Sequence, residues 1–185
     1  MTREAENNII AKILSGDDRA YGYFVDKYKA AVYNLAYRMT GQLQETEDLT
    51  QEIFIKAYAS LKKFDVNRKF FPWLYAIALN TLRNHLKQKK PVVWYDEENA
   101  NQKPAVANPH NPETMVSQVE AYRRLAEKMQ KLPLLQQEAV VLRYYQELSF
   151  EDIAEILDVS LSAAKMRVYR GLEKLADLLK KEDNS

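Results

Sequence analysis

The stretch "LSFEDIAEILDVSLSAAKMRVYRG", residues 148–171, predicts two helices separated by a three-residue turn. Ser149, with Asp152 three residues later, has the pattern of a capping box that begins the first helix. The text "DVS" forms the turn, and Ser160 can cap the second helix. A short helix, a tight turn and a helix with a cationic face are typical of a helix-turn-helix, whose second helix enters a DNA major groove.

The second of these helices has an apolar face and a cationic face. At about 100° per residue, the inner arc contains Leu161, Ala164, Val168, Leu172 and Leu175. The outer surface carries Ser162, Lys165, Met166, Arg167, Tyr169 and Arg170. The alternative is an ordinary helical hairpin whose basic residues are only solvated.

A second informative stretch is "FDVNRKFFPWLYAIALN", residues 64–80, which places aromatic and cationic side chains together. Pro72 suits the first turn of a helix that continues to about residue 89. On that helix Trp73 projects near a polar arc that contains Asn80, Arg83, Asn84 and Lys87. Aromatics beside cations and amides would form a stacking surface for single-stranded bases. The alternative is a core helix with a basic lip, and Trp73 at the domain edge.

The segment "ETEDLTQEIFIKAYASL", residues 45–61, predicts an amphipathic helix. Its polar face could dock a partner protein or could simply be solvated, and it carries Asp48, Gln51, Glu52 and Phe54 or Ile55. We expect no metal site, because no histidine is near in the sequence and the acidic residues point in different directions.

The composition predicts an all-α protein. Only four of the 185 residues are glycines, and none lies between Gly41 and Gly171, whereas β-hairpins need more turn residues.

The absence of cysteine excludes zinc ribbons, disulfide scaffolds and thiol nucleophiles. No apolar run reaches the roughly 20 residues of a membrane span and no signal peptide is evident, so we expect a cytoplasmic protein without membrane insertion. No phosphate loop or catalytic carboxylate pair is evident, and we expect no enzyme activity, cofactor or small-molecule substrate.

The chain divides into two small helical domains joined by a flexible linker. Residues 91–118 contain four of the six prolines and no apolar period, which is typical of a linker. We therefore expect domains at residues 1–90 and 119–185. The first domain is basic, because it has 15 Lys and Arg residues against 10 Asp and Glu. Helices are expected near 5–15, 17–40, 44–61, 72–89, 117–131, 134–145, 150–157 and 161–180.

Together the two halves resemble the sigma subunits of bacterial RNA polymerase, specifically the extracytoplasmic-function group, also called group IV. The matching texts are "YRMTGQLQETEDLTQEIFIKAY" at 37–58, "FPWLYAIALN" at 71–80, "LPLLQQEAVVLRYYQELSFEDIAEIL" at 132–157 and "KMRVYRG" at 165–171. Their order and spacing carry the resemblance, which covers nearly the whole chain outside the linker and the extreme termini.

The resemblance implies that the first domain binds core RNA polymerase and melts the promoter −10 element, and that the second reads the −35 element. Core polymerase would dock on Asp48, Gln51, Glu52 and Phe54. The −10 element would contact Arg68, Lys69, Phe70, Phe71, Trp73, Asn80, Arg83, Asn84 and Lys87. The −35 duplex would contact Ser162, Lys165, Met166, Arg167, Tyr169 and Arg170. The resemblance also implies an anti-sigma protein that clasps both domains.

The turn of the helix-turn-helix departs from the family pattern. Where such proteins usually read G-x-P-x-G-T-V-K-S-R, this chain has "DVSLSAAKMR". Asp158 stands at the turn glycine, and Asp tolerates a left-handed backbone better than most residues. Met166 replaces a small hydroxyl-bearing residue, which would exchange a hydrogen bond with DNA for an apolar contact. Two alternatives remain: a stand-alone helix-turn-helix regulator, and a helical adaptor that binds no DNA.

Overall fold

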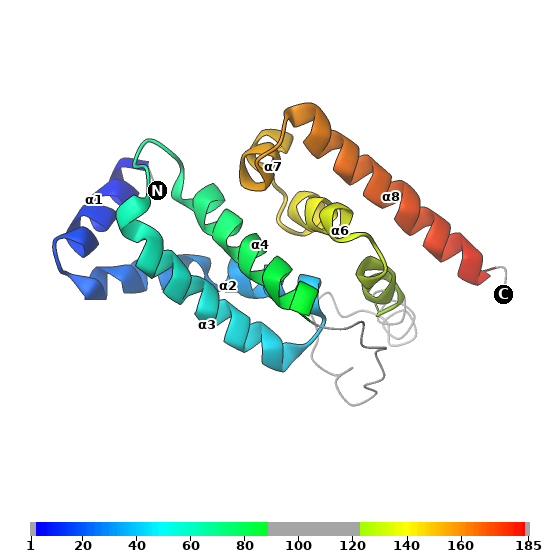
Figure 1. Cartoon of the computed structure of the whole chain (residues 1–185), viewed down its shortest axis with the longest axis horizontal. Coiled ribbons are helices and arrows are strands. Elements are labelled where there is room, and N and C mark those ends of the chain that lie inside the picture. The colour runs from blue at the N-terminus through cyan, green and yellow to red at the C-terminus, as the bar shows by residue number, and fades with distance from the viewer. Residues whose placement is uncertain (1–2, 89–122, 184–185) are drawn as a thin grey trace, which may run out of the picture.

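The structure is a computed structural model that describes residues 3–88 and 123–183, and every regular element in these two ranges is a helix (Figure 1). This confirms the predicted all-α class. The predicted linker, residues 91–118, lies outside the described residues. None of the described helices combines the length and the apolar character that crossing a bilayer requires.

Six helical elements make up the first half, and the longer ones lie close to the predicted ranges. They are α1 (Arg3–Leu14), the 3₁₀ turn η1 (Asp18–Tyr21), α2 (Gly22–Thr40), α3 (Leu43–Ser60), the 3₁₀ turn η2 (Leu61–Lys63) and α4 (Phe70–Gln88). Helices α2, α3 and α4 pack against one another. Phe24 and Phe70, both buried, stack with ring centroids 4.0 Å apart. This aromatic pair fixes the start of α4 against α2.

The second half begins with a helical segment at 123–130. It continues with α6 (Leu134–Val140), the π-helical turn η4 (Val141–Tyr145), α7 (Phe150–Leu157) and the long α8 (Leu161–Asp183). The predicted helix-turn-helix is therefore α7, a short turn and α8, and α8 packs on α6 and α7. Three local predictions are confirmed here. The backbone N–H of Asp152 donates to Ser149 Oγ at 3.0 Å, Asp158 has a left-handed φ of 52°, and Ser160 Oγ accepts from the N–H of Ala163.

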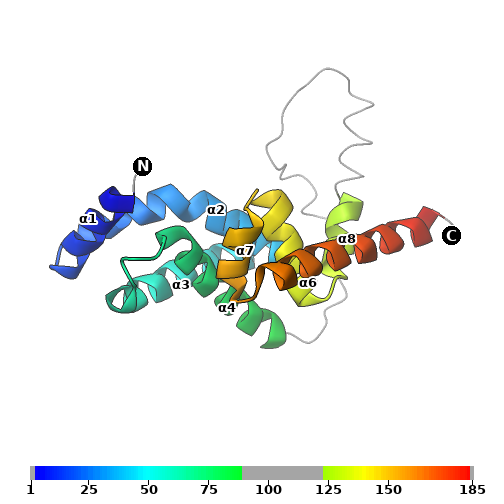
Figure 2. The same ribbon diagram turned by 90° about the horizontal axis from the view of Figure 1, so that it is seen from above.

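The two halves contact each other, which nothing in the sequence pattern predicted. Helix α7 lies beside α4 (Figures 1 and 2), and one cluster of buried side chains includes residues from both halves. Polar bonds add to this contact. Tyr75 donates its hydroxyl to Gln146 Oε1 at 2.8 Å, and Gln130 donates its side-chain amide to the Arg38 carbonyl at 3.0 Å. The guanidinium of Arg38 lies 4.2 Å from the ring centroid of Tyr145.

Candidate nucleic-acid and partner-binding surfaces

Helix α8 presents the predicted DNA-facing side chains on one side. Ser162, Lys165, Met166, Tyr169 and Arg170 are exposed, whereas Ala164, Val168 and Leu175 are buried. The one error on the inner arc is Leu161, which is 38% exposed. It is the first residue of α8, and burial of the inner arc begins only at Ala164, one turn further along. The exposed face can therefore approach a DNA groove without rearrangement of α8.

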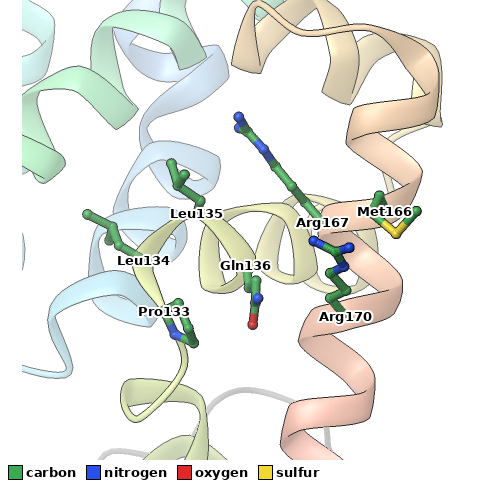
Figure 3. A pocket seen from close by; sticks show the side chains of 7 residues that line it. All are labelled: Pro133, Leu134, Leu135, Gln136, Met166, Arg167 and Arg170. Atoms are coloured by element: carbon green, nitrogen blue, oxygen red, sulfur yellow. The ribbon is translucent and has the colours of Figure 1, made fainter.

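Arg167 is partly buried because it lines a groove between α6 and α8. The groove is a cavity of about 340 Å³, lined by Pro133, Leu134, Leu135, Gln136, Met166, Arg167 and Arg170. Figure 3 shows the Arg167 and Arg170 side chains extending from α8 toward α6. Leu135, on the opposite wall, is 48% exposed. Arg167 thus borders both the DNA-facing side of α8 and an apolar groove.

The predicted stacking surface at the start of α4 contains one residue that cannot belong to it. Phe70 is 1% exposed and stacks on Phe24, so its assignment to the base-contacting surface is wrong. The periodicity of α4 could not show this, because the partner ring comes from α2. Trp73 is half-buried, and its ring centroid lies 5.0 Å from that of Phe64. Phe71 is also half-buried, and its ring centroid lies 4.3 Å from that of Tyr75.

The polar arc of α4 is exposed at Asn80, Asn84 and Lys87, as predicted. Arg83, between them, is instead engaged by the second half of the chain. It donates to both carboxylate oxygens of Glu138, from Nε at 2.6 Å and from Nη2 at 2.7 Å, and from Nη1 to Asn80 Oδ1 at 3.1 Å. The hydrogen bond with Glu138 raises the pKa of the Arg83 guanidinium. Four predicted −10 residues thus share one helix face, and one of them, Arg83, is bound to the second half of the chain.

Glu138 is a buried charged residue that the sequence analysis did not single out. Its side chain is fully buried, although it lies on α6 among apolar neighbours. A buried carboxylate without a partner would be costly. Glu138 directly precedes the apolar residues "AVVL", and this position was a signal that it is buried and needs a cation from elsewhere in the chain. The sequence alone could not show that this cation is Arg83.

The two predicted −10 cations in the loop before α4 also contact the second half. Lys69 Nζ lies 3.0 Å from Asp152 Oδ1, and Arg68 Nη2 lies 3.4 Å from Glu155 Oε1. The hydrogen bond from Lys69 to Asp152 raises the pKa of the Lys69 ammonium. The pKa of Asp152 is lowered, first by the hydrogen bond from the Ser149 hydroxyl and also by Lys69. Both ions of this pair are therefore held in their charged forms.

The predicted polymerase-docking face of α3 is exposed at Asp48, Gln51 and Glu52. The aromatic residue assigned to it is not, because Phe54 is only 6% exposed and belongs to the core. Its neighbour Ile55 is 67% exposed and is the apolar side chain that lies on that face. The assignment of Phe54 is therefore corrected to Ile55, the other residue that the amphipathic pattern allowed.

The acidic start of α3 shows no metal-binding arrangement. Glu45 Oε2 lies 2.9 Å from His85 Nε2 on α4, and both side chains are partly buried. Within residues 3–88 and 123–180, no three His, Asp or Glu side chains are grouped as metal ligands would be. The contact between Glu45 and His85 instead ties α3 to α4.

Two known sequence families match the chain: Sigma-70 region 2 over residues 24–92, and Sigma-70 region 4 over residues 122–175. The chain is similar over nearly its whole length to the ECF RNA polymerase sigma factor SigW of Bacillus subtilis, with 38% identity over 92% of this chain and 95% of that protein. It is also 32% identical to the RNA polymerase sigma-H factor of Pseudomonas aeruginosa, over 94% of this chain and 93% of that one.

Solved structures show the same fold. CnrH, in complex with the cytosolic domain of CnrY, matches with a TM-score of 0.70 and 25% identity, over 94% of this chain and 96% of that one. The sigma factor RpoE of Bartonella quintana, in complex with the anti-sigma factor NepR, matches with a TM-score of 0.63 and 19% identity, over 86% of this chain and 96% of that one. The second likeness concerns the fold alone.

Proposed function

The chain belongs to the extracytoplasmic-function sigma factors, which direct RNA polymerase to promoters, and on this premise we propose which surfaces do so. Core RNA polymerase binds the exposed face of α3. The −35 element is read by α8, and the −10 element is melted by α4 and the loop before it. The stand-alone regulator considered from the sequence is not favoured, because both sigma regions match.

The observation that carries the −35 assignment is the distribution of exposure along α8. Lys165 and Arg170 are exposed together with Ser162, Met166 and Tyr169, while the opposite side of the helix is buried against α6 and α7. Lysine and arginine can contact phosphates, and arginine can also donate two hydrogen bonds to guanine. The exposed Met166 would supply an apolar contact in the groove.

For the −10 element, the support is the placement of aromatic and polar side chains on one face of α4. With Phe70 buried, Phe71 and Trp73 remain as the aromatic rings within reach of an unpaired base. Asn80 and Asn84 offer amide groups on the exposed arc further along. Stacking on an aromatic ring contributes about 1–3 kcal/mol per base, which can help to stabilise a melted strand.

The wider assignment follows the family. We place the chain in the group IV subdivision and in the cytoplasm, as an initiation factor without catalytic activity of its own. The relative CnrH is bound to the cytosolic domain of CnrY in its solved structure, which supports a protein partner for this chain as well. We propose that this partner is an anti-sigma protein.

The deciding experiment compares Arg170→Ala with Lys174→Ala, a control one turn further along α8 at another exposed cation. Each variant is assembled with core RNA polymerase and tested on duplex promoters and on promoters with a pre-melted −10 element. Arg170→Ala should weaken duplex binding, at a cost of about 1–3 kcal/mol if the arginine reads a base. It should leave initiation on the pre-melted template nearly intact. Equal impairment on both templates, or by the control, would contradict the assignment of α8.

A further inference from the structure

Helix α1 contacts the loop that leads into α4 (Figure 1), although none of the surfaces proposed above includes this helix. Arg3 donates to the carbonyl oxygen of Val66 from Nε at 3.3 Å and from Nη2 at 3.0 Å. Asn7 donates its side-chain amide to the same oxygen at 3.1 Å. Three N–H groups of α1 thus converge on one backbone oxygen, which is 63 and 59 residues away from the two donors in the sequence.

The Val66 carbonyl belongs to a tight turn that precedes α4. The N–H of Arg68 donates to the Asp65 carbonyl at 2.9 Å, and the N–H of Asn67 donates to Asp65 Oδ1 at 2.8 Å. Neither of these bonds involves the Val66 carbonyl, so α1 supports the turn from outside. The turn places Arg68 just before the aromatic start of α4. A group that holds the turn therefore also orients the residues proposed to contact the −10 element.

Helix α1 is itself anchored to the core and to α2. The two donor residues lie four positions apart on one helix face, and Ile10, three positions further along, is 1% exposed. Glu6, in the same turn as the donors, accepts from Lys27 Nζ and from the Tyr28 hydroxyl of α2, both at 2.6 Å. The backbone that carries the two donors is therefore fixed to the rest of the first half.

We propose that Arg3 and Asn7 are positioning residues for promoter melting, which hold the turn before α4 in the shape that receives the −10 strand. This inference rests on the proposed function of α4 and its preceding loop. A turn that is ordered before the strand arrives binds it without the entropic cost of ordering the loop on binding. Both side chains act through a backbone acceptor, and Val66 is 44% exposed, so Val66→Ala should leave the support intact.

Hydrogen exchange of the Arg68 amide measures the support without DNA. In Arg3→Lys, which lacks the second donor, and in Asn7→Asp, which cannot donate, this amide should exchange about fivefold faster, the factor expected from the loss of one hydrogen bond. Asn8→Asp, the same change at the next residue, which is exposed, is the matched control. Arg19→Lys, at an exposed arginine of η1, is the control for Arg3→Lys. Wild-type exchange in both test variants would overturn the inference.

Strand binding by the assembled polymerase tests whether the shape of the turn matters for melting. Each variant is combined with core RNA polymerase and titrated with a fluorescein-labelled single strand that carries the promoter −10 sequence. Affinity should fall about fivefold to tenfold in Arg3→Lys and in Asn7→Asp, while polymerase co-elution and duplex binding stay at the wild-type level. Arg3→Lys keeps the positive charge. Wild-type affinity in Arg3→Lys beside a loss in Arg3→Ala would show that Arg3 contacts phosphate directly, and would overturn the inference.

A double variant tests whether Arg3 acts through the turn. Arg68→Ala removes a cation that the turn presents, and Arg3→Lys added to it should lower strand affinity by less than it does in the wild-type chain. Fully additive losses would overturn the inference, because the two residues would then act independently. Failure of the proposed function is distinguishable. Strand binding would then be unaffected by Arg68→Ala and by Trp73→Ala, while the Arg68 amide would still exchange faster in Asn7→Asp.

Discussion

Gly171 of α8 packs directly against Val140 of α6. A Cβ atom at position 171 would lie 2.6 Å from Val140 Cγ2 and 3.3 Å from the Gln136 carbonyl oxygen. The glycine is therefore required by packing, because the neighbouring atoms include backbone that cannot turn aside. This contact sets how deeply α8 rests on α6.

Gly171→Ala should destabilise the chain by about 1–3 kcal/mol, the usual cost of an overpacked contact. The matched control is Gly22→Ala at the start of α2, where nothing lies within 4 Å of the added Cβ. That change should be neutral or should stabilise by about 0.4–1 kcal/mol, because alanine restricts the unfolded chain. Urea unfolding followed by circular dichroism measures both. An unchanged midpoint for Gly171→Ala would show that α8 can shift away from α6.

Stability should fall in acid because of Asp152. The pKa of its carboxyl lies below its ordinary value of 3.8 in the folded chain, first because of the hydrogen bond from Ser149 and also because of Lys69. A lowered folded-state pKa contributes stability that is present above the ordinary value and is lost as the pH falls through the folded value. The urea midpoint should decline between about pH 5 and about pH 2.

Asp152→Asn should reduce that decline, because an amide does not titrate. Glu151→Gln, one residue earlier on α7 and exposed, is the control and should keep the wild-type slope. Identical slopes for wild type and Asp152→Asn would show that other carboxylates account for the acid sensitivity.

Two neighbouring residues of α3 should separate partner binding from folding. Ile55→Ala removes a side chain that is 67% exposed, so stability should change by less than about 0.5 kcal/mol while co-elution with core RNA polymerase weakens. Phe54→Ala removes a core side chain and should cost about 3–5 kcal/mol of stability. Size-exclusion chromatography with core polymerase, together with urea unfolding, measures both effects. Wild-type affinity in Ile55→Ala would remove α3 as the docking helix.

Promoter opening should depend on Trp73 and Asn80 more than polymerase binding does. Trp73→Ala and Asn80→Ala each remove a group from the proposed −10 surface, and Gln88→Ala on an exposed turn of the same helix is the control. Permanganate reactivity of unpaired thymines reports opening, and co-elution reports polymerase binding. We expect a large loss of opening with binding retained. Equal losses in both assays would assign Trp73 and Asn80 to structural roles.

The parts of this structure that depend on adjacent residues were predictable. Ser149 and Asp152 form a cap within four residues, and Asp158 ends α7 in the left-handed conformation, which Asp tolerates better than most residues. On α3, periodicity did not decide which side chain faces the core, because Phe54 and Ile55 are adjacent residues of the helix. Which of the two is buried depends on packing against α2 and α4, which a single helix does not encode.

The contacts between the halves could not be predicted at all. Arg83 and Glu138 meet across 55 residues of sequence, and each alone resembles an ordinary charged residue on an amphipathic helix. Their pairing depends on where α6 lies against α4, and this placement results from the whole buried cluster. The same holds for Lys69 and Asp152, because the cap role of Asp152 was readable locally while its second partner was not.

The contact between the halves depends on the number of residues in the π-helical turn η4. In this turn the N–H of Gln146 bonds to the carbonyl of Val141, five residues earlier, so one extra residue is accommodated at the end of α6. An ordinary α-helical turn there would rotate the following side chains by about 100°. Tyr145 and Gln146 would then lose Arg38 and Tyr75. A single-codon deletion in this turn could thus uncouple the halves while every charged side chain stays in place.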